Sequence, residues 1–306
     1  MYTNRREFLQ QVAAWSAGVA AAAPIFRWIP SARAEATAQS ILAVAKGGDY
    51  AAMVGRVLEP LGGIGAFVSS GDRVVVKPNI GWDRNPEQAA NTHPNVVNAL
   101  VRLCLDAGAK QVMVFDRPCN NERMTYRNSG IQEAVESIRS DRAVCFFMDK
   151  RKYVPVNIER GKSLDQWEFY RDALEADCYI NVPIAKHHQL AKLTLGLKNV
   201  MGVIGGNRGQ IHGGMGQKLA DLNTVVAPKL TVIDATRILL RHGPSGGSLD
   251  DVKVLDTLIA SRDIVAADAY ATTLFEMSPN EIASTVAAYE MGLGEIDLAK
   301  VGVVEV

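Results

Sequence analysis

Short apolar runs alternate with amphipathic segments along most of this chain. Runs with the length and composition of strands occur at residues 41–46, 73–79, 111–116, 143–148, 153–159, 178–183, 229–234, 254–260 and 301–306. Segments with helical periodicity lie between them, at 50–61, 95–106, 130–139, 166–175, 219–226, 264–275 and 279–291. This alternation predicts the α/β class, as a doubly wound, mostly parallel sheet with helices on both faces.

The segment 73–116 shows this alternation most clearly. Three consecutive valines at 74–76 are typical of a parallel strand that is covered on both faces. The helix at 95–106 follows a Thr-His-Pro sequence, in which Thr92 or His93 caps the helix and the proline fits the first helical position. We therefore expect a β-α-β unit with a right-handed crossover.

The first 34 residues have the pattern of an export signal. Residues 4–10 read Asn-Arg-Arg-Glu-Phe-Leu-Gln, a twin-arginine pattern, and an alanine-rich apolar stretch follows at 12–26. This stretch is shorter than the ~20 apolar residues that a membrane span needs, and a small-x-small cleavage site follows at 32–34. We therefore expect a signal peptide at 1–34 that the twin-arginine translocase recognises. Residues 35–306 would then form a single α/β domain in the periplasm.

The charge beyond this segment is nearly balanced. The chain has 33 basic and 33 acidic residues, and the first 34 residues hold four basic and one acidic residue, which leaves 29 basic and 32 acidic residues. This balance argues against a nucleic-acid partner. No later stretch is long and apolar enough to predict a membrane span.

The four cysteines are far apart and form no C-x-x-C pair, so the sequence gives a zinc ribbon no local support. Cys104 lies in an apolar helical pattern, and Cys145 and Cys178 lie in strand patterns, so all three are predicted to be buried. Cys119 lies in a polar loop and is predicted to be accessible.

Polar side chains recur at the carboxyl ends of the predicted strands, where an open α/β sheet binds its ligands. They are Lys77 and Asn79, Asp116 and Arg117, Asn181 followed by Lys186 and His187, and Asp234 followed by Arg237. The predicted helix cap His93 belongs to the same edge. We expect Lys77, His93, Asp116, Lys186, His187 and Lys198 to converge on one site.

The stretch 178–212 carries most of this chemistry and also a family resemblance. Its segments NVPIAKHH, TLGLKNVMG and IH resemble the family called domain of unknown function 362, and so do VVVKPNI at 74–80 and IASRDIVAADAYATTLF at 259–275. The family's activity is largely unassigned. Some members carry a ferredoxin-type run of four cysteines, which is missing here, so the resemblance implies no iron–sulfur cluster. The chain also has no G-x-G-x-x-G fingerprint and no P-loop. The plainest alternative is a solvated basic loop after a strand.

The residue types allow two kinds of site. The first is a basic cleft for a small anion, with His187, Lys186 and Asp116 as catalytic residues. Its substrate-binding residues would be Lys77, Asn79, His93, Arg117, Lys198 and Asn199. The second holds a divalent metal on imidazole and carboxylate groups, for which we expect His187, His212 and Asp234. Adjacent side chains on a strand point in opposite directions, so at most one of His187 and His188 should face the cleft.

Three classes of function remain open. The first is an exported enzyme that acts on a small anionic substrate. The second is a binding or maturation partner of a periplasmic redox protein, which the export signal and the ferredoxin-bearing relatives suggest. The third is a nickel-cofactor enzyme similar to lactate racemase.

Overall fold

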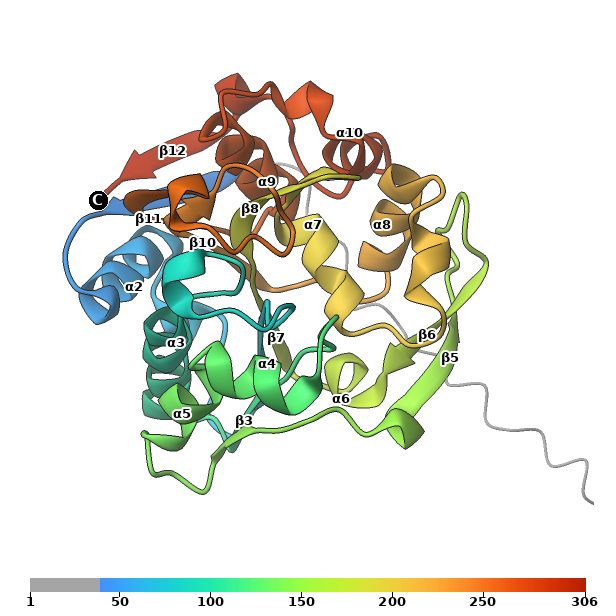
Figure 1. Ribbon diagram of the computed structural model, residues 1–306. Helices are drawn as coiled ribbons and strands as arrows, with labels where there is room; N and C mark the ends of the chain where they lie inside the picture. The colour runs from blue at the N-terminus through green and yellow to red at the C-terminus, as the bar shows by residue number, and fades with distance from the viewer. Residues whose placement is uncertain (1–38) are drawn as a thin grey trace, which may run out of the picture. The chain divides into compact units, whose positions relative to one another are not determined.

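The computed structural model describes residues 39–306, so the predicted signal peptide lies outside the described residues. A ten-stranded sheet has the order β12-β1-β11-β10-β7-β2-β3-β4, and β8 and β9 join it through β10 (Figure 1). The strands of this sheet are β1 (Ile41–Lys46), β2 (Arg73–Pro78), β3 (Gln111–Val114), β4 (Ala143–Cys145), β7 (Cys178–Val182), β8 (Ile184–His188), β9 (Lys192–Thr194), β10 (Leu230–Leu239), β11 (Val252–Ser261) and β12 (Gly302–Glu305).

The sheet is mostly parallel, as predicted. β10, β7, β2, β3 and β4 run parallel to one another, and β8 also runs parallel to β10. β11 is the reversed strand between β10 and β1, and β9 runs antiparallel to β8. The carboxyl ends of β2, β3 and β7 therefore meet at one edge of the sheet.

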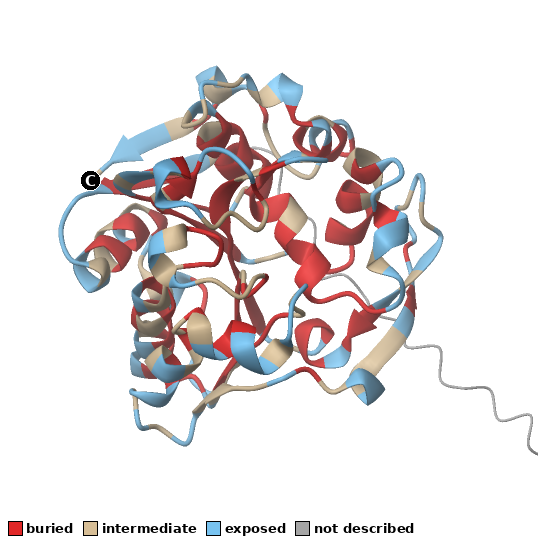
Figure 2. Cartoon of the chain, in the orientation of Figure 1, coloured by how far each residue is buried: buried red, intermediate tan, exposed pale blue. Residues whose placement is uncertain are grey.

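Helices cover both faces, because successive side chains of each buried strand point to opposite sides. Val74 and Val76 of β2 pack into the core beneath α2 (Tyr50–Leu58), α3 (Pro94–Asp106) and α5 (Ile131–Glu136). Val75 packs into a second core on the other face, and each buried valine contributes roughly 1.5–3 kcal/mol. The helices on that face are α6 (Arg171–Leu174), α7 (Gly196–Asn199), α8 (Met215–Asn223), α9 (Ile264–Thr273) and α10 (Ala283–Glu290). Figure 2 shows buried strands between the two helical layers, which confirms the doubly wound α/β class.

The helix predicted at 166–175 is wrong. This segment forms β6 (Gln166–Tyr170), which pairs antiparallel with β5 (Tyr153–Asn157) and ends in the single turn of α6. Aromatic residues favour pleated strands, and the rings of Tyr153 and Tyr170 pack across the pair with their centroids 5.3 Å apart. Cross-strand packing therefore outweighs the helical spacing of the apolar residues.

The segment after β7 contains elements that the hydrophobic pattern did not predict. Pro183 separates β7 from β8, and the chain then turns back as β9 and enters the short helix α7. The buried carboxylate of Asp268 accepts hydrogen bonds from the backbone N–H groups of Gly196 (2.7 Å) and Leu197 (2.9 Å) at the start of α7. Asp268 thus satisfies two N–H groups that have no partner within the helix, and it fixes α7 above the sheet.

Two further expectations concern the described residues. Among residues 39–306, no helix has both the length and the hydropathy to cross a membrane. Cys104 and Cys178 are buried and Cys119 is exposed, as expected, whereas Cys145 is only half-buried because β4 lies at the edge of the sheet.

Candidate functional site

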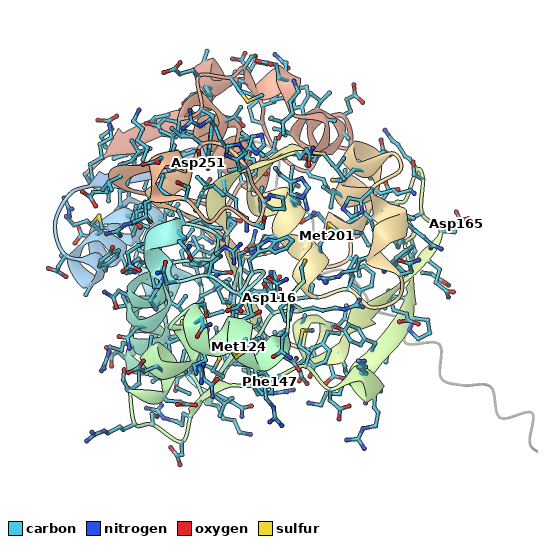
Figure 3. The ribbon with its side chains drawn as sticks, viewed as in Figure 1. Asp116, Met124, Phe147, Asp165, Met201 and Asp251 are labelled. Atoms are coloured by element: carbon cyan, nitrogen blue, oxygen red, sulfur yellow. The ribbon has the colours of Figure 1, made fainter. Side chains whose placement is uncertain are left out.

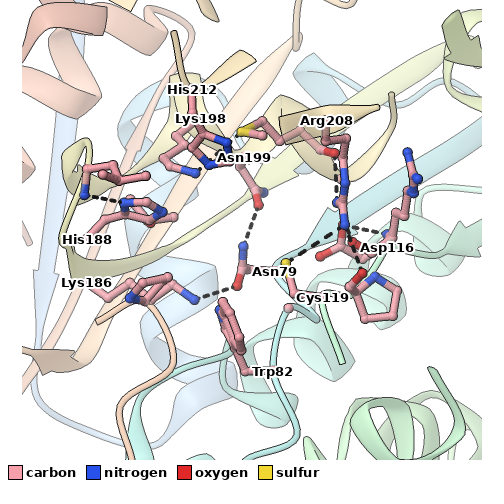
Figure 4. Close-up of a pocket in the computed structure, with 18 of the residues that line it drawn as sticks. Asn79, Trp82, Asp116, Cys119, Lys186, His188, Lys198, Asn199, Arg208 and His212 are labelled. Carbon is pink, nitrogen blue, oxygen red and sulfur yellow. Dashed lines mark hydrogen bonds between the residues drawn. The ribbon is translucent and has the colours of Figure 1, made fainter. Parts of the chain in front are cut away.

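A pocket of about 510 Å³ opens at the carboxyl ends of β2, β3 and β7 (Figure 4). Its walls come from the segments that follow these strands, together with β8, α7 and the glycine-rich segment beyond α7. Asp116 and Met201, which both line the pocket, are labelled in Figure 3. The residues that carry its chemistry are Asn79, Trp82, Asp116, Arg117, Cys119, Lys186, His188, Thr194, Lys198, Asn199, Arg208 and His212.

A buried ion pair lies behind the pocket wall. The Lys77 ammonium is 3.0 Å from the carboxylate of Asp116, and both side chains are almost completely buried. Burial lowers the pKa of Lys77, while the negative charge of Asp116 opposes this effect. Asp116 also accepts hydrogen bonds from the backbone N–H groups of Ile80 and Arg117. Since the pair neutralises itself, it leaves no net charge for a ligand.

Lys186 on β8 is also buried but has no such carboxylate. Its Nζ donates to Oδ1 of Asn79 at 2.9 Å and to the backbone oxygen of Ala90. Among residues 39–306, Lys186 takes part in no ion pair. The ion pair in this region joins Lys77 to Asp116. Burial, with a further contribution from the positive charge of Lys198, lowers the pKa of Lys186 to about 7. A large fraction of Lys186 is therefore a neutral amine near neutral pH.

Side-chain amides fix the polar surface around Lys186. Nδ2 of Asn79 donates to Oδ1 of Asn199 at 3.1 Å, and this same oxygen accepts a hydrogen bond from Lys77 at 2.8 Å. Asn199 must therefore direct its oxygen toward Lys77 and Asn79, and Asn79 must direct its own oxygen toward Lys186. Figure 4 shows Lys186, Asn79 and Asn199 in this row.

Two more cations face the pocket without an acidic partner. Nζ of Lys198 on α7 lies 3.4 Å from the sulfur of Met201, which is a weak acceptor. Burial lowers the pKa of Lys198 to about 8, and Arg208 and Lys77 add to the effect. Arg208 donates to the backbone oxygens of Arg117 (2.7 Å), Met201 (3.2 Å) and Pro118 (2.9 Å). Carbonyl groups thus hold the Arg208 guanidinium in place without neutralising it.

His188 lines the pocket, whereas His187, the predicted catalytic residue, does not. The two side chains point in opposite directions from β8, and Nδ1 of His187 accepts a hydrogen bond from Gly243 outside the pocket. Nδ1 of His188 accepts from the backbone of Leu190 and Ala191, which leaves its Nε2 as the protonated nitrogen. Burial and the charges of Lys198 and Lys186 lower the pKa of His188 to about 3, so its imidazole is neutral.

The structure does not bring His93 and Asp234 into the pocket. His93 caps α3 and stacks on Tyr50 with the ring centroids 4.1 Å apart. Asp234 accepts hydrogen bonds from the backbone N–H groups of His93 and Thr236. His212 does line the pocket. The predicted metal ligands His187, His212 and Asp234 therefore do not meet, and the described part of the chain holds no group of three His, Cys, Asp or Glu side chains placed to bind a metal ion.

The other predicted binding residues are close together. Asn79, Arg117, Lys198 and Asn199 line the pocket, as do the predicted catalytic residues Lys186 and Asp116, and Lys77 lies directly behind them.

Sequence reasoning missed five residues as parts of the site: Trp82, Cys119, Thr194, Arg208 and His188. Trp82 lies in the loop after β2, whose backbone is fixed by Asn91, and Thr194 lies on the unpredicted strand β9. Arg208 follows a glycine cluster, where no periodicity indicates the direction of a side chain. Adjacent residues of a strand point to opposite faces, and this alternation was the one available signal for His188. It shows that only one of His187 and His188 can face the pocket but does not show which one.

Solved structures resemble this chain in fold. The apoprotein of lactate racemase from Thermoanaerobacterium thermosaccharolyticum is 12% identical, with a TM-score of 0.45, over 74% of this chain and 55% of that chain. A protein from Thermotoga maritima is 11% identical, with a TM-score of 0.41, over 74% of this chain and 59% of that chain. This chain thus spans little more than half the length of either structure.

Sequence comparison identifies a relative and a family. A thylakoid-associated protein from Synechocystis sp. is 28% identical over 254 residues, which are 80% of this chain and 76% of that protein. The model of the family described as domain of unknown function (DUF362) matches residues 74–273, a range that contains every residue lining the pocket. The chain therefore belongs to the DUF362 family.

Proposed function

We propose that this protein is an enzyme whose pocket binds a small organic anion, with Lys186 as the acid–base residue. The observation that carries the proposal is the set of three basic side chains, Lys186, Lys198 and Arg208, that line one pocket and face neutral acceptors rather than a carboxylate. Lys186 is buried, and the other two are half-buried. Charges removed from water are normally paired, so an anionic group of a ligand is the partner that this arrangement lacks.

The pocket residues divide into two roles. Lys198 and Arg208 bind the carboxylate or phosphate of the ligand, because each presents N–H donors that remain charged near neutral pH. Lys186 accepts or donates a proton, because a pKa of about 7 makes both of its protonation states accessible. The volume of about 510 Å³ suits a small ligand, since pockets for small molecules span ~300–1,000 Å³. Asp116 and the asparagines form part of the pocket wall, and Lys77 supports them from behind.

Export by the twin-arginine route remains part of the proposal. It rests on the sequence pattern of residues 1–34, which lie outside the described residues. A metal site is not part of the proposed function, because the predicted ligands do not meet.

Calorimetric titration of lactate, succinate and phosphate into the full chain tests anion binding. At least one of these anions should bind to the wild type, and Lys198→Met should weaken binding about tenfold to hundredfold, since a hydrogen bond to a charged group contributes ~1.5–3 kcal/mol. Lys253→Met, which removes an exposed lysine on β11, serves as the control and should leave affinity unchanged.

The pH dependence has a defined sign. Lys198 and Lys186 gain their charges as the pH falls through about 8 and about 7, so anion affinity should rise over this interval. Equal affinities of the wild type and Lys198→Met, or no binding of any of the three anions, would contradict the proposal.

A further inference from the structure

Lys186 has a neighbourhood that suits covalent chemistry as well as proton transfer. A neutral lysine amine has two hydrogens and one lone pair. Both hydrogens of Lys186 have acceptors, Oδ1 of Asn79 and the backbone oxygen of Ala90. Because the amide row from Lys77 through Asn199 fixes the orientation of Asn79, the acceptor that faces Lys186 is an oxygen. The lone pair is then the free group of an amine that lines the pocket.

The other two lysines differ from Lys186 in this respect. Lys77 lies 3.0 Å from the carboxylate of Asp116, whose negative charge favours the ammonium form. Lys198 has one weak contact, with the sulfur of Met201, so nothing directs its hydrogens away from the pocket. Its higher pKa, about 8 against about 7 for Lys186, also keeps Lys198 charged over a wider range of pH. Lys186 is therefore the nucleophile and Lys198 the anion holder.

Building on the proposed function, we infer that Lys186 forms an imine with the carbonyl group of a short oxo acid whose carboxylate is bound by Lys198 and Arg208. A ligand of this class meets both features of the pocket at once. Its carboxylate supplies the negatively charged partner that Lys198 and Arg208 lack, and its carbonyl carbon is the electrophile for the amine of Lys186. A desolvated lysine beside another cation is a recurrent way of activating an amine for this reaction.

The reaction balances without any further reagent. The lone pair of Nζ attacks the carbonyl carbon, and the carbonyl oxygen takes up a proton while the nitrogen gives one up, which yields a carbinolamine. The carbinolamine then loses this oxygen as water together with the second hydrogen of the nitrogen, and the carbon–nitrogen double bond forms. One amine and one carbonyl thus become one imine and one water, with no change of oxidation state. Protonation of the imine nitrogen then makes the former carbonyl carbon an electron acceptor for chemistry at the neighbouring carbon.

Reductive trapping tests the inference directly. The full chain is incubated with pyruvate or with acetoacetate in the presence of sodium cyanoborohydride, which converts an imine into a stable secondary amine. Peptide mass spectrometry then locates the adduct. We expect one adduct per chain on Lys186 with at least one of the two acids, while the exposed Lys253 reacts no faster than other surface lysines. Lactate, which has the carboxylate but no carbonyl, should compete and suppress the adduct.

Two variants separate the roles of the lysines. Lys186→Met should abolish the specific adduct. Lys198→Met keeps the nucleophile but loses a carboxylate partner, so the rate of trapping at Lys186 should fall about tenfold at low acid concentration. The second variant and the lactate competition still test the inference if Lys186→Met does not fold.

The outcomes separate this inference from the proposed function. Equal labelling of Lys186 and Lys253 without protection by lactate would overturn the imine. Absence of any adduct on Lys186, in a protein that binds lactate by calorimetry, would also overturn the imine but leave the anion site standing. Failure of both trapping and anion binding would reject both proposals.

Discussion

Three lysines near one pocket differ in the group that each side-chain nitrogen faces. Lys77 faces a carboxylate, Lys186 faces two neutral oxygens, and Lys198 faces a thioether. The sequence shows all three alike, as single lysines near the carboxyl ends of predicted strands or beyond them. Their different roles follow from their partners, Asp116, Asn79 and Met201.

Removing the charge of Lys77 should be strongly destabilising. Lys77→Met leaves the buried Asp116 carboxylate without its ion partner, which should lower the free energy of unfolding by about 3–5 kcal/mol. The double variant Lys77→Met with Asp116→Asn removes both charges but keeps an acceptor for the backbone. It should therefore be more stable than the sum of the two single effects predicts. Urea denaturation of the four proteins measures this coupling, and strictly additive effects would show that the pair does not interact.

Residue positions were predictable where strand direction alone determines them. Lys77, Asn79, Asp116 and Lys186 lie at or near the carboxyl ends of strands in the parallel part of the sheet, which brings them together. The prediction was wrong where a side chain has a local structural role, because the sequence does not reveal such partners. His93 caps a helix, and Asp234 binds the backbone next to it.

At the scale of elements, the site depends on the close approach of the segment after α7 to β2 and β3. Gly202 ends the 3-10 turn Val200–Gly202, and a Cβ atom at this position would overlap the Asp116 carboxylate and the Lys77 side chain. Only glycine lets this turn close over the buried ion pair. The pocket wall formed by Met201 and Arg208 depends on that contact.

Gly202→Ala should therefore disturb both stability and the site. Overpacking of a closed contact costs about 1–3 kcal/mol or more, and we expect a loss of this size together with weaker anion binding. Gly65→Ala is a matched control, because no atom lies within 4 Å of its added Cβ and its backbone is free of positive φ strain. Chemical denaturation should show a change of less than about 1 kcal/mol for the control. Similar behaviour of the two variants would mean that the turn has room to adjust.

The hydrophobic pattern predicted helices and strands correctly where the neighbouring elements of the β-α-β units bury them. It was wrong at 166–175, because pairing with β5 decided the structure, and that pairing is not local. It also missed β8 and β9, whose short sequences lack a clear period. β8 is a strand because β10 provides a partner, and β9 is a strand because it pairs with β8.

At the scale of the whole molecule, alternation of strands and helices was enough to predict the doubly wound class and the edge of the sheet at which the pocket lies. The strand order was not predictable, since the reversed strand β11 and its pairing with β1 depend on contacts between distant segments. Residues from several separate segments converge on one pocket because of this strand order, and no single segment determines that convergence.

The export prediction also belongs to the whole molecule. Changing Arg5→Lys together with Arg6→Lys should leave the precursor in the cytoplasm, because the translocase reads the arginine pair. Cell fractionation in a bacterial host measures the distribution. An alanine at Arg27, outside the pair, is the control and should be exported. Normal accumulation of the double variant in the periplasm would contradict this part of the account.

Titration of the lysine side chains by NMR tests the central claim most directly. Assignments come from the loss of one signal each in Lys186→Met and Lys198→Met. We predict a pKa of about 7 for Lys186 and of about 8 for Lys198, because burial disfavours the ammonium form of both and neither forms an ion pair with a carboxylate. Addition of a bound anion should raise both pKa values, since a nearby negative charge stabilises the ammonium form. If both lysines instead titrate with the exposed ones near ~10.4, or if a bound anion leaves their pKa values unchanged, the pocket is not the anion site described here.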